Sequence, residues 1–133
     1  MLRFQVITLA WNGMLTLLRY EVLNTAGISN YRKAHALSPQ DSYLSSELAR
    51  FLIEKDISLD EGMELIAPLV EMYPKNASYL YTYGLGLYKL GELLKSQKVL
   101  QRSWDQKPYY DHRHFLLLKK LNDEIASQNA GTL

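Results

Sequence analysis

The segment Asp-His-Arg-His at residues 111–114 brings carboxylate and imidazole side chains together. Both are ordinary zinc ligands, so Asp111, His112 and His114 are the first candidates for a metal site. Residues two apart on a helix point to different faces, and a helix starting here would keep the two histidines from sharing one ion. We therefore expect a solvated helix N-terminus and no metal.

A second candidate for chemistry is the glycine-rich stretch GLGLYKLG, which contains Gly84, Gly86 and Gly91. Glycines near the start of a helix can cradle phosphate, but the dinucleotide-binding pattern is G-x-G-x-x-G directly after a strand. The spacing here is G-x-G-x4-G, and no strand is predicted before it. Gly84 is better explained by a close helix contact and Gly91 by a turn, so no cofactor is expected.

Other catalytic arrangements are not evident in the 133 residues. The absence of cysteine excludes thiolate catalysis, disulfides and cysteine-based zinc sites. Asp60 and Glu61 are neighbouring carboxylates, but they fall in a predicted turn, and no Ser-His-Asp or lysine arrangement stands out. The sequence predicts that the protein is not an enzyme, and the lack of cysteine is compatible with the cytoplasm.

The predicted helices that carry the candidate residues form a repeating pattern along the chain. Three prolines stand 35 and 34 residues apart, and a small residue lies twelve positions before each of them. The prolines are Pro39, Pro74 and Pro108, and the small residues are Gly27, Gly62 and Ser96. Proline disfavours helix in the residue before it, so each marks the end of a helix.

Large apolar residues recur three, four and seven positions apart in each repeat, which is the period of a helix. They are Trp11, Leu18, Tyr31, Leu48, Leu52, Ile66, Leu80, Leu87 and Leu100. The third repeat reads Leu80-x2-Tyr83-Gly84-x2-Leu87, then Ser96-x3-Leu100, then Pro108. This pattern resembles the tetratricopeptide repeat, W-x2-L-G-x2-Y, then A-x3-F, then P.

The resemblance covers about residues 8–110 and implies an all-α fold, a right-handed superhelical array of antiparallel helix hairpins. We expect one domain over residues 1–133, with repeats at about 8–41, 42–76 and 77–110. After Pro108, an apolar stripe predicts a capping helix over residues 111–127. The stripe consists of Phe115, Leu118, Leu121 and Ile125.

Members of the family bind proteins, and their first helices line a concave face that receives a peptide or a partner helix. The resemblance therefore implies a protein-interaction scaffold. Mapped onto this sequence, the groove would carry Asn12, Thr16, Arg19, Ser46, Arg50, Glu54, Tyr81, Leu85, Tyr88, Phe115 and Lys119. Some members clamp a chaperone's terminal carboxylate with basic side chains and asparagines. The matching slots hold Asn12, Thr16, Glu47, Ser78 and Thr82, so this mode is not expected.

Two other functions compete with this interpretation. One is an accessory or assembly domain of a larger protein or enzyme complex. The other is RNA binding, which the tyrosines and lysines of the third repeat suggest through base stacking. The net charge of +1 argues against nucleic acid, so a protein or peptide partner is favoured.

Residues 1–23 are unusually apolar for the outer helix of an array, and this predicts either self-association through them or a longer array. A signal peptide or a membrane-associated N-terminus is the alternative for this segment. Asn12, Gly13 and Arg19 interrupt the apolar run, so no membrane span is predicted.

Overall fold

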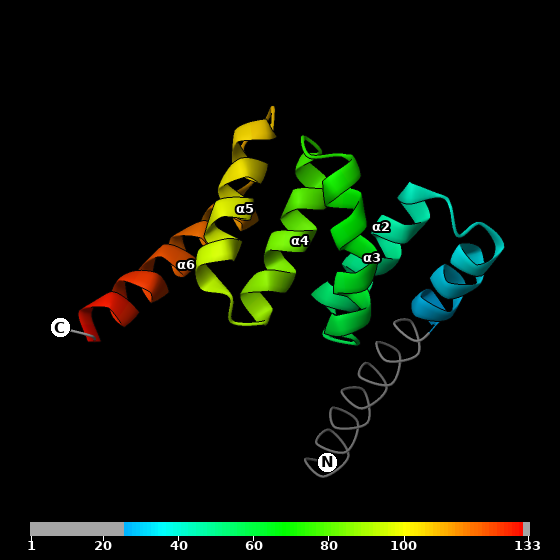
Figure 1. Ribbon diagram of the computed structural model, residues 1–133, viewed down its shortest axis with the longest axis horizontal. Coiled ribbons are helices and arrows are strands. Elements are labelled where there is room, and N and C mark those ends of the chain that lie inside the picture. Colours follow the sequence, from blue (N-terminus) through cyan, green and yellow to red (C-terminus); the bar gives the residue numbers. More distant parts are fainter. Residues whose placement is uncertain (1–25, 132–133) are drawn as a thin grey trace, which may run out of the picture.

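The computed structural model describes residues 26–131 of the chain (Figure 1). Every regular element in this part is an α-helix, which confirms the all-α class. Residues 26–37 are helical and are followed by α2 (Ser42–Glu54), α3 (Leu59–Met72), α4 (Ala77–Lys89), α5 (Leu93–Gln106) and α6 (His112–Gly131). Residues 1–23, predicted to self-associate, lie outside the described residues, as do Asn12, Thr16 and Arg19.

The helices pair as antiparallel hairpins, α2 with α3 and α4 with α5. Figure 1 shows the turns within these hairpins at one edge of the array and the α3–α4 and α5–α6 turns at the other. Each second helix also packs on the following first helix, α3 on α4 and α5 on α6, and α2 contacts α4. This connectivity stacks the hairpins side by side, and within residues 26–131 α6 packs only on helices that precede it in the sequence.

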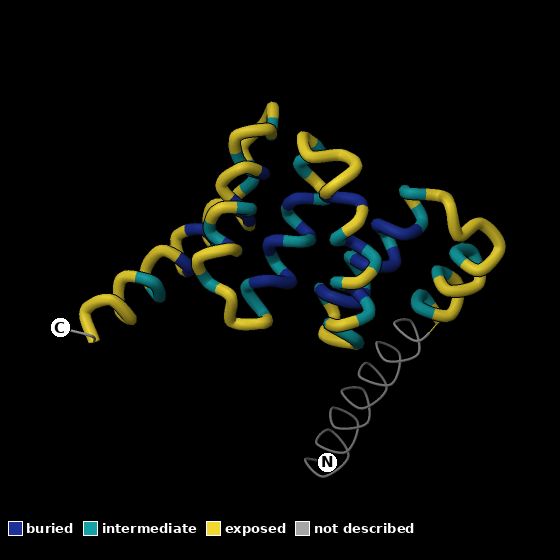
Figure 2. Tube along the Cα trace, viewed as in Figure 1, coloured by how far each residue is buried: buried dark blue, intermediate teal, exposed yellow. Residues whose placement is uncertain are grey.

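The core runs between the layers as two clusters of buried residues (Figure 2). One cluster joins α2, α3 and α4, and the other joins α5 to α6. The predicted core positions within the described residues are buried except Tyr31, which is partly exposed. The buried ones are Leu48, Leu52, Ile66, Leu80, Leu87 and Leu100.

The expected close approach of paired helices is confirmed at Gly84. A Cβ atom there would lie 2.6 Å from the side chain of Leu100, so only hydrogen fits between α4 and α5. Gly86 faces the opposite way and leaves no room for a Cβ beside Met63 of α3, so it serves the contact between repeats. Gly91 forms the α4–α5 turn with φ +82°, a conformation that glycine adopts without strain.

Polar contacts tie the helices to one another. The buried hydroxyls of Ser96 and Ser103 donate to the backbone oxygens of Gly84 and Ala77, both at 2.7 Å. Between repeats, the Lys89 ammonium of α4 donates to the backbone oxygen of Ile53 at 2.7 Å, at the C-terminal end of α2. These contacts satisfy carbonyl groups while fixing the distance between neighbouring helices.

The first helix of each hairpin begins with a side-chain cap. Asp41 accepts hydrogen bonds from two amides of α2, and Asn76 accepts one from α4. Asp111 accepts the amides of Arg113 and His114 at the start of α6. A carboxylate or amide oxygen there satisfies amides that have no partner within the helix, so these helix starts are fixed locally.

Helix α6 differs from its expected form in two ways. Its buried anchors are His114, Leu118 and Leu121, whereas Phe115 is 43% exposed. The apolar stripe therefore includes the histidine in place of Phe115, and the expectation of a solvated His114 is wrong. The reason is that the start of α6 packs between α4 and α5, where His114 contacts both Tyr81 and Trp104, while Leu118 and Leu121 are buried as predicted. The helix also extends to Gly131, past the expected end at residue 127.

Candidate partner-binding surface

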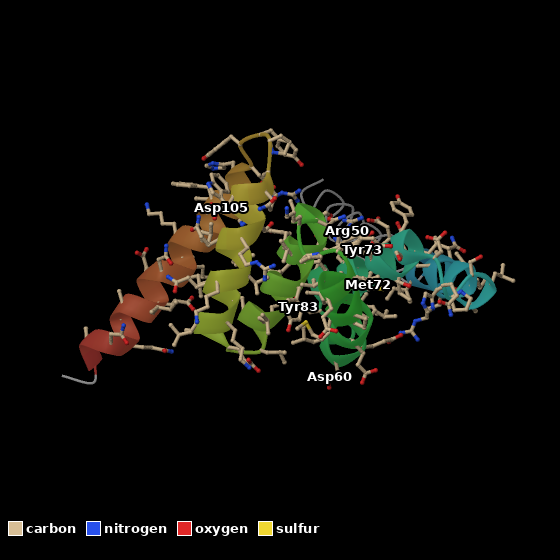
Figure 3. The ribbon with its side chains drawn as sticks, turned by 45° about the horizontal axis from the view of Figure 1, so that its top comes forward. Arg50, Asp60, Met72, Tyr73, Tyr83 and Asp105 are labelled. Carbon is tan, nitrogen blue, oxygen red and sulfur yellow. The ribbon has the colours of Figure 1, made fainter. Side chains whose placement is uncertain are left out.

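The predicted groove residues of α2 form a charged cluster with one addition, Glu47. Arg50 forms an ion pair with Glu47 at 2.6 Å and with Glu54 at 3.4 Å, and all three side chains are partly exposed. The hydrogen bond that the Arg50 guanidinium donates to Glu47 is the main cause that raises the pKa of Arg50 above its usual value. Two carboxylates around one cation leave this cluster of α2 net negative; Figure 3 labels its cation, Arg50. Ser46 is buried and donates to the backbone oxygen of Tyr43, so its hydroxyl is occupied.

Tyr81 of α4 lies at the centre of the candidate surface. Its ring is half-buried, with a centroid 5.0 Å from that of His114 in α6. Burial is the main cause that raises the pKa of its hydroxyl, with further contributions from Asp111 and Glu54, while Arg113 acts in the opposite direction. Charges from α2 and from the start of α6 therefore act on the same phenol. Within residues 26–131, no hydrogen bond occupies the Tyr81 hydroxyl.

An internal ion pair supports Tyr81 from the end of α5. The Lys107 ammonium lies 4.9 Å from the Tyr81 ring centroid and forms an ion pair with Asp111 at 2.6 Å. The Lys107 side chain is only 8% exposed, so its ammonium group pairs with Asp111 inside the protein and is not accessible to a ligand. The hydrogen bond from Lys107 is also the main cause that lowers the pKa of Asp111.

The other predicted site residues have different surroundings. The Tyr88 hydroxyl donates to Glu124 of α6 at 2.7 Å, and Leu85 packs against the core cluster of α2, α3 and α4. Phe115 packs against Trp104 of α5, with ring centroids 6.4 Å apart, and Lys119 is exposed on α6. The structure therefore brings Arg50, Glu54 and Tyr81 to one surface, whereas Tyr88 anchors α6 and Phe115 lies against α5.

Sequence reasoning assigned Glu47 only to a clamp slot, and it did not place Lys107, Asp111 or Arg113 beside Tyr81. The Glu47-x2-Arg50-x3-Glu54 spacing could have placed Glu47 beside Arg50, because residues three and four apart are neighbours on a helix. Asp111 directly before an apolar helical stripe is a helix-capping signal. Lys107 and Arg113 carry no such local signal, because their positions depend on how α5 and α6 pack against α4.

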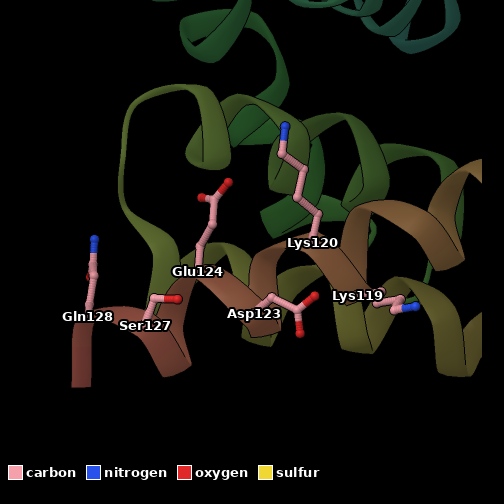
Figure 4. A pocket seen from close by; sticks show the side chains of 6 residues that line it. All are labelled: Lys119, Lys120, Asp123, Glu124, Ser127 and Gln128. Carbon is pink, nitrogen blue, oxygen red and sulfur yellow. The ribbon is translucent and has the colours of Figure 1, made fainter. Parts of the chain in front are cut away.

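The described residues offer no enclosed small-molecule site at α6. A hollow of about 490 Å³ lies against this helix, and all its lining residues belong to α6 (Figure 4). They are Lys119, Lys120, Asp123, Glu124, Ser127 and Gln128. Since a single helix supplies all the lining found within residues 26–131, the hollow is an open depression on that part of the structure.

Metal binding and membrane insertion each require a recognisable arrangement of residues. In residues 26–131, no group of three or more His, Asp or Glu side chains is arranged to hold a metal ion. None of the helices in that range is long and apolar enough to cross a membrane.

Comparison with known proteins identifies the fold. No family model and no curated protein matches the sequence. Among solved structures, the chain is similar to the first tetratricopeptide-repeat domain of Spaghetti (RPAP3) bound to the HSP90 peptide SRMEEVD. The TM-score is 0.67 at 15% identity, over 80% of this chain and 82% of that one. MamA is similar with a TM-score of 0.65 at 18% identity, over 84% of this chain and 64% of MamA. The chain therefore has the tetratricopeptide-repeat fold, a right-handed superhelical array of antiparallel helix hairpins.

Proposed function

We propose that the protein is a non-catalytic interaction module that binds a peptide or partner helix across α2, α4 and the start of α6. The observation that carries this proposal is the setting of Tyr81. Its ring is held by α6 and the end of α5, while its hydroxyl has no hydrogen bond within residues 26–131. A half-buried tyrosine combines apolar contact area with one free hydrogen-bond donor, which suits a protein ligand.

The charges around Tyr81 indicate a ligand unlike the acidic HSP90 peptide that the RPAP3 domain binds. Glu47 lies in one of the slots that the resemblance assigns to a carboxylate clamp, and it is engaged with Arg50. Thr82, in another such slot, is only 3% exposed and carries no charge. An acidic peptide end would meet the Glu47 carboxylate in one of these slots and the uncharged Thr82 in the other, so repulsion would oppose binding there.

The peptide SRMEEVD itself is a defined probe for this part of the proposal. Fluorescence anisotropy of the labelled peptide should give no saturable binding, with Kd weaker than about 1 mM. Saturable binding that is lost in high salt would show that the surface accepts an acidic end, which would contradict the proposed charge preference.

The binding surface itself is tested with charge-matched variants. Glu47→Gln with Glu54→Gln neutralises the candidate surface, and Glu64→Gln with Glu71→Gln makes the same charge change on the exposed face of α3. Proteins captured from source cells should be retained by wild type and the α3 variant and lost by the α2 variant. Equal capture by all three chains, each with confirmed helical content, would place the binding site elsewhere.

A further inference from the structure

His114 is a fully buried histidine that joins three helices. Its ring centroid lies 5.0 Å from that of Tyr81 in α4 and 5.3 Å from that of Trp104 in α5. Its Nε2 atom is 2.8 Å from the backbone oxygen of Leu100 in α5. Because a carbonyl oxygen can only accept a hydrogen bond, Nε2 must carry the proton of the neutral imidazole.

The other ring nitrogen, Nδ1, is buried and has no hydrogen-bond partner among the described residues. In the neutral ring, Nδ1 is an unpaired acceptor. A second proton would have to bind there, and it would create both a buried positive charge and an N–H group without an acceptor. Both changes are unfavourable for a fully buried ring, so docking of α6 favours the neutral imidazole.

The charged neighbours do not relieve this penalty. Asp111 is the acidic neighbour, but its carboxylate already accepts hydrogen bonds from Lys107 and from the backbone amides of Arg113 and His114. Lys107, from the end of α5, repels a second positive charge. Desolvation is the largest cause that lowers the pKa of His114, and Lys107 adds to it, against smaller opposing effects of Leu100 and Asp111. The titratable and charged groups that act on the ring are Tyr81 from α4, Lys107 from the end of α5 and Asp111 from the start of α6. Arg113, the next residue of α6, acts on Tyr81.

We propose that His114 is a pH-sensitive latch, and that a proton on Nδ1 releases α6 from α4 and α5 while the two preceding hairpins remain folded. The release is local because α6 is the last helix of the described array and packs against earlier helices alone. Its buried anchors are His114, Leu118 and Leu121, and His114 is the only titratable one. Units at the end of a stacked array can open without unfolding their neighbours.

The sign of the pH effect follows from the lowered pKa. The unfolded chain binds the proton more readily than the docked helix does, so acid favours release. Docking is at full strength above the ordinary histidine pKa of about 6.5 and weakens as pH falls below it, through the folded-state pKa. The pKa of Asp111 is lowered from an already acidic value, so that carboxylate remains ionised throughout this window.

Release of α6 would also remove Arg113 and the support of Tyr81 from the candidate binding surface. This consequence rests on the proposed function, whereas the latch does not. The test therefore measures α6 docking and not ligand binding, so the two ideas can fail separately.

Trp104 provides a built-in reporter, because its ring contacts His114. We would follow Trp104 fluorescence of the full chain carrying Trp11→Phe, between pH 7.5 and 4.5, with hydrogen exchange at both limits. The expected result is a reversible change with a midpoint below 6.5 and a rise in amide exchange in α6, while α3 and α4 remain protected. His114→Gln, whose amide can still donate to the Leu100 oxygen, should abolish the transition. His112→Gln, at an exposed position, should keep it.

Two outcomes would overturn the latch. One is the same acid transition in His114→Gln as in wild type. The other is continued protection of α6 amides across the whole range. If His114→Gln does not fold, titration of the wild-type imidazoles by NMR decides the matter. A His114 signal that titrates below its ordinary value together with α6 exchange supports the latch, and one that titrates while α6 stays protected refutes it.

Discussion

The two buried serine hydroxyls of α5 connect the helices of one hairpin directly through backbone oxygens of α4. Ser96→Ala removes the donor to Gly84, and Ser103→Ala removes the donor to Ala77. Each substitution should lower the free energy of unfolding by about 1 kcal/mol, the usual net contribution of a neutral hydrogen bond. Chemical denaturation of both variants measures this loss. Ser127→Ala, at an exposed position of α6, is the control and should stay within about 0.5 kcal/mol of wild type.

Asp111 caps α6 and also forms an ion pair with Lys107. Because only the ion pair requires a charged carboxylate, measurements at different pH distinguish the two roles. Asp111→Asn retains an oxygen for the α6 amides but loses the charge that pairs with Lys107. We expect a loss of about 1 kcal/mol at pH 7. Because the folded-state pKa of Asp111 is lowered, its contribution is full above the unfolded-state value of about 3.9 and falls as pH drops through the folded value.

Urea denaturation of wild type and Asp111→Asn across this range tests that role. The difference between the two unfolding free energies should shrink as pH falls below about 4. A difference that stays constant down to the lowest pH at which both chains fold would mean that the carboxylate charge contributes nothing.

At the scale of the helices, two glycines of α4 are small for different contacts. Gly84→Ala would place a methyl group 2.6 Å from the Cγ atom of Leu100. This side chain is fully buried, and its Cγ atom is too close to the α5 backbone to move aside freely. Overpacking of this kind lowers the free energy of unfolding by about 1–3 kcal/mol. The better helix propensity of alanine offsets about 1 kcal/mol of this loss. Gly86→Ala meets the flexible end of Met63, which can move aside.

Thermal or chemical unfolding of both variants should therefore rank Gly84→Ala as clearly destabilised and Gly86→Ala as close to wild type. The reverse order would mean that the contact between repeats is tighter than the contact within a hairpin.

Lys89 is the polar link between the second and third repeats. Its ammonium caps the end of α2 through the backbone oxygen of Ile53 and also contacts Asp56, whose side chain is 75% exposed. Lys89→Met keeps the aliphatic stem and should cost about 1.5 kcal/mol, since the lost bond is charge-assisted. Asp56→Asn should cost less than about 0.5 kcal/mol, because an exposed ion pair contributes little. Equal losses in the two variants would assign the effect to the ion pair and not to the helix cap.

The sequence predicted the helices better than it predicted the site. Leu48, Ile66 and Leu100 could be assigned to the core because repeated spacing reports which face of each helix is covered. His114 could not, because a histidine at a helix start carries the same local signal whether the helix lies in solvent or against two others. Lys107 and Tyr81 are far apart in the sequence, and their contact depends on how α5 packs against α4.

At the scale of the whole molecule, the array should not be equally stable along its length. Helix α4 contacts α2, α3 and α5, and its Tyr81 and Tyr88 side chains also contact α6. Among the described helices, only α4 and α5 contact α6, and its residues 126–131 are exposed. In a linear array, the opening free energy of each element follows the number of neighbours that hold it. Native-state hydrogen exchange at pH 7 should therefore show the slowest amides in α4 and progressively faster exchange along α6 toward residue 131. Uniform protection of α4 and α6 would instead mean that the whole array opens as one cooperative unit, and the end helix could not be released by itself.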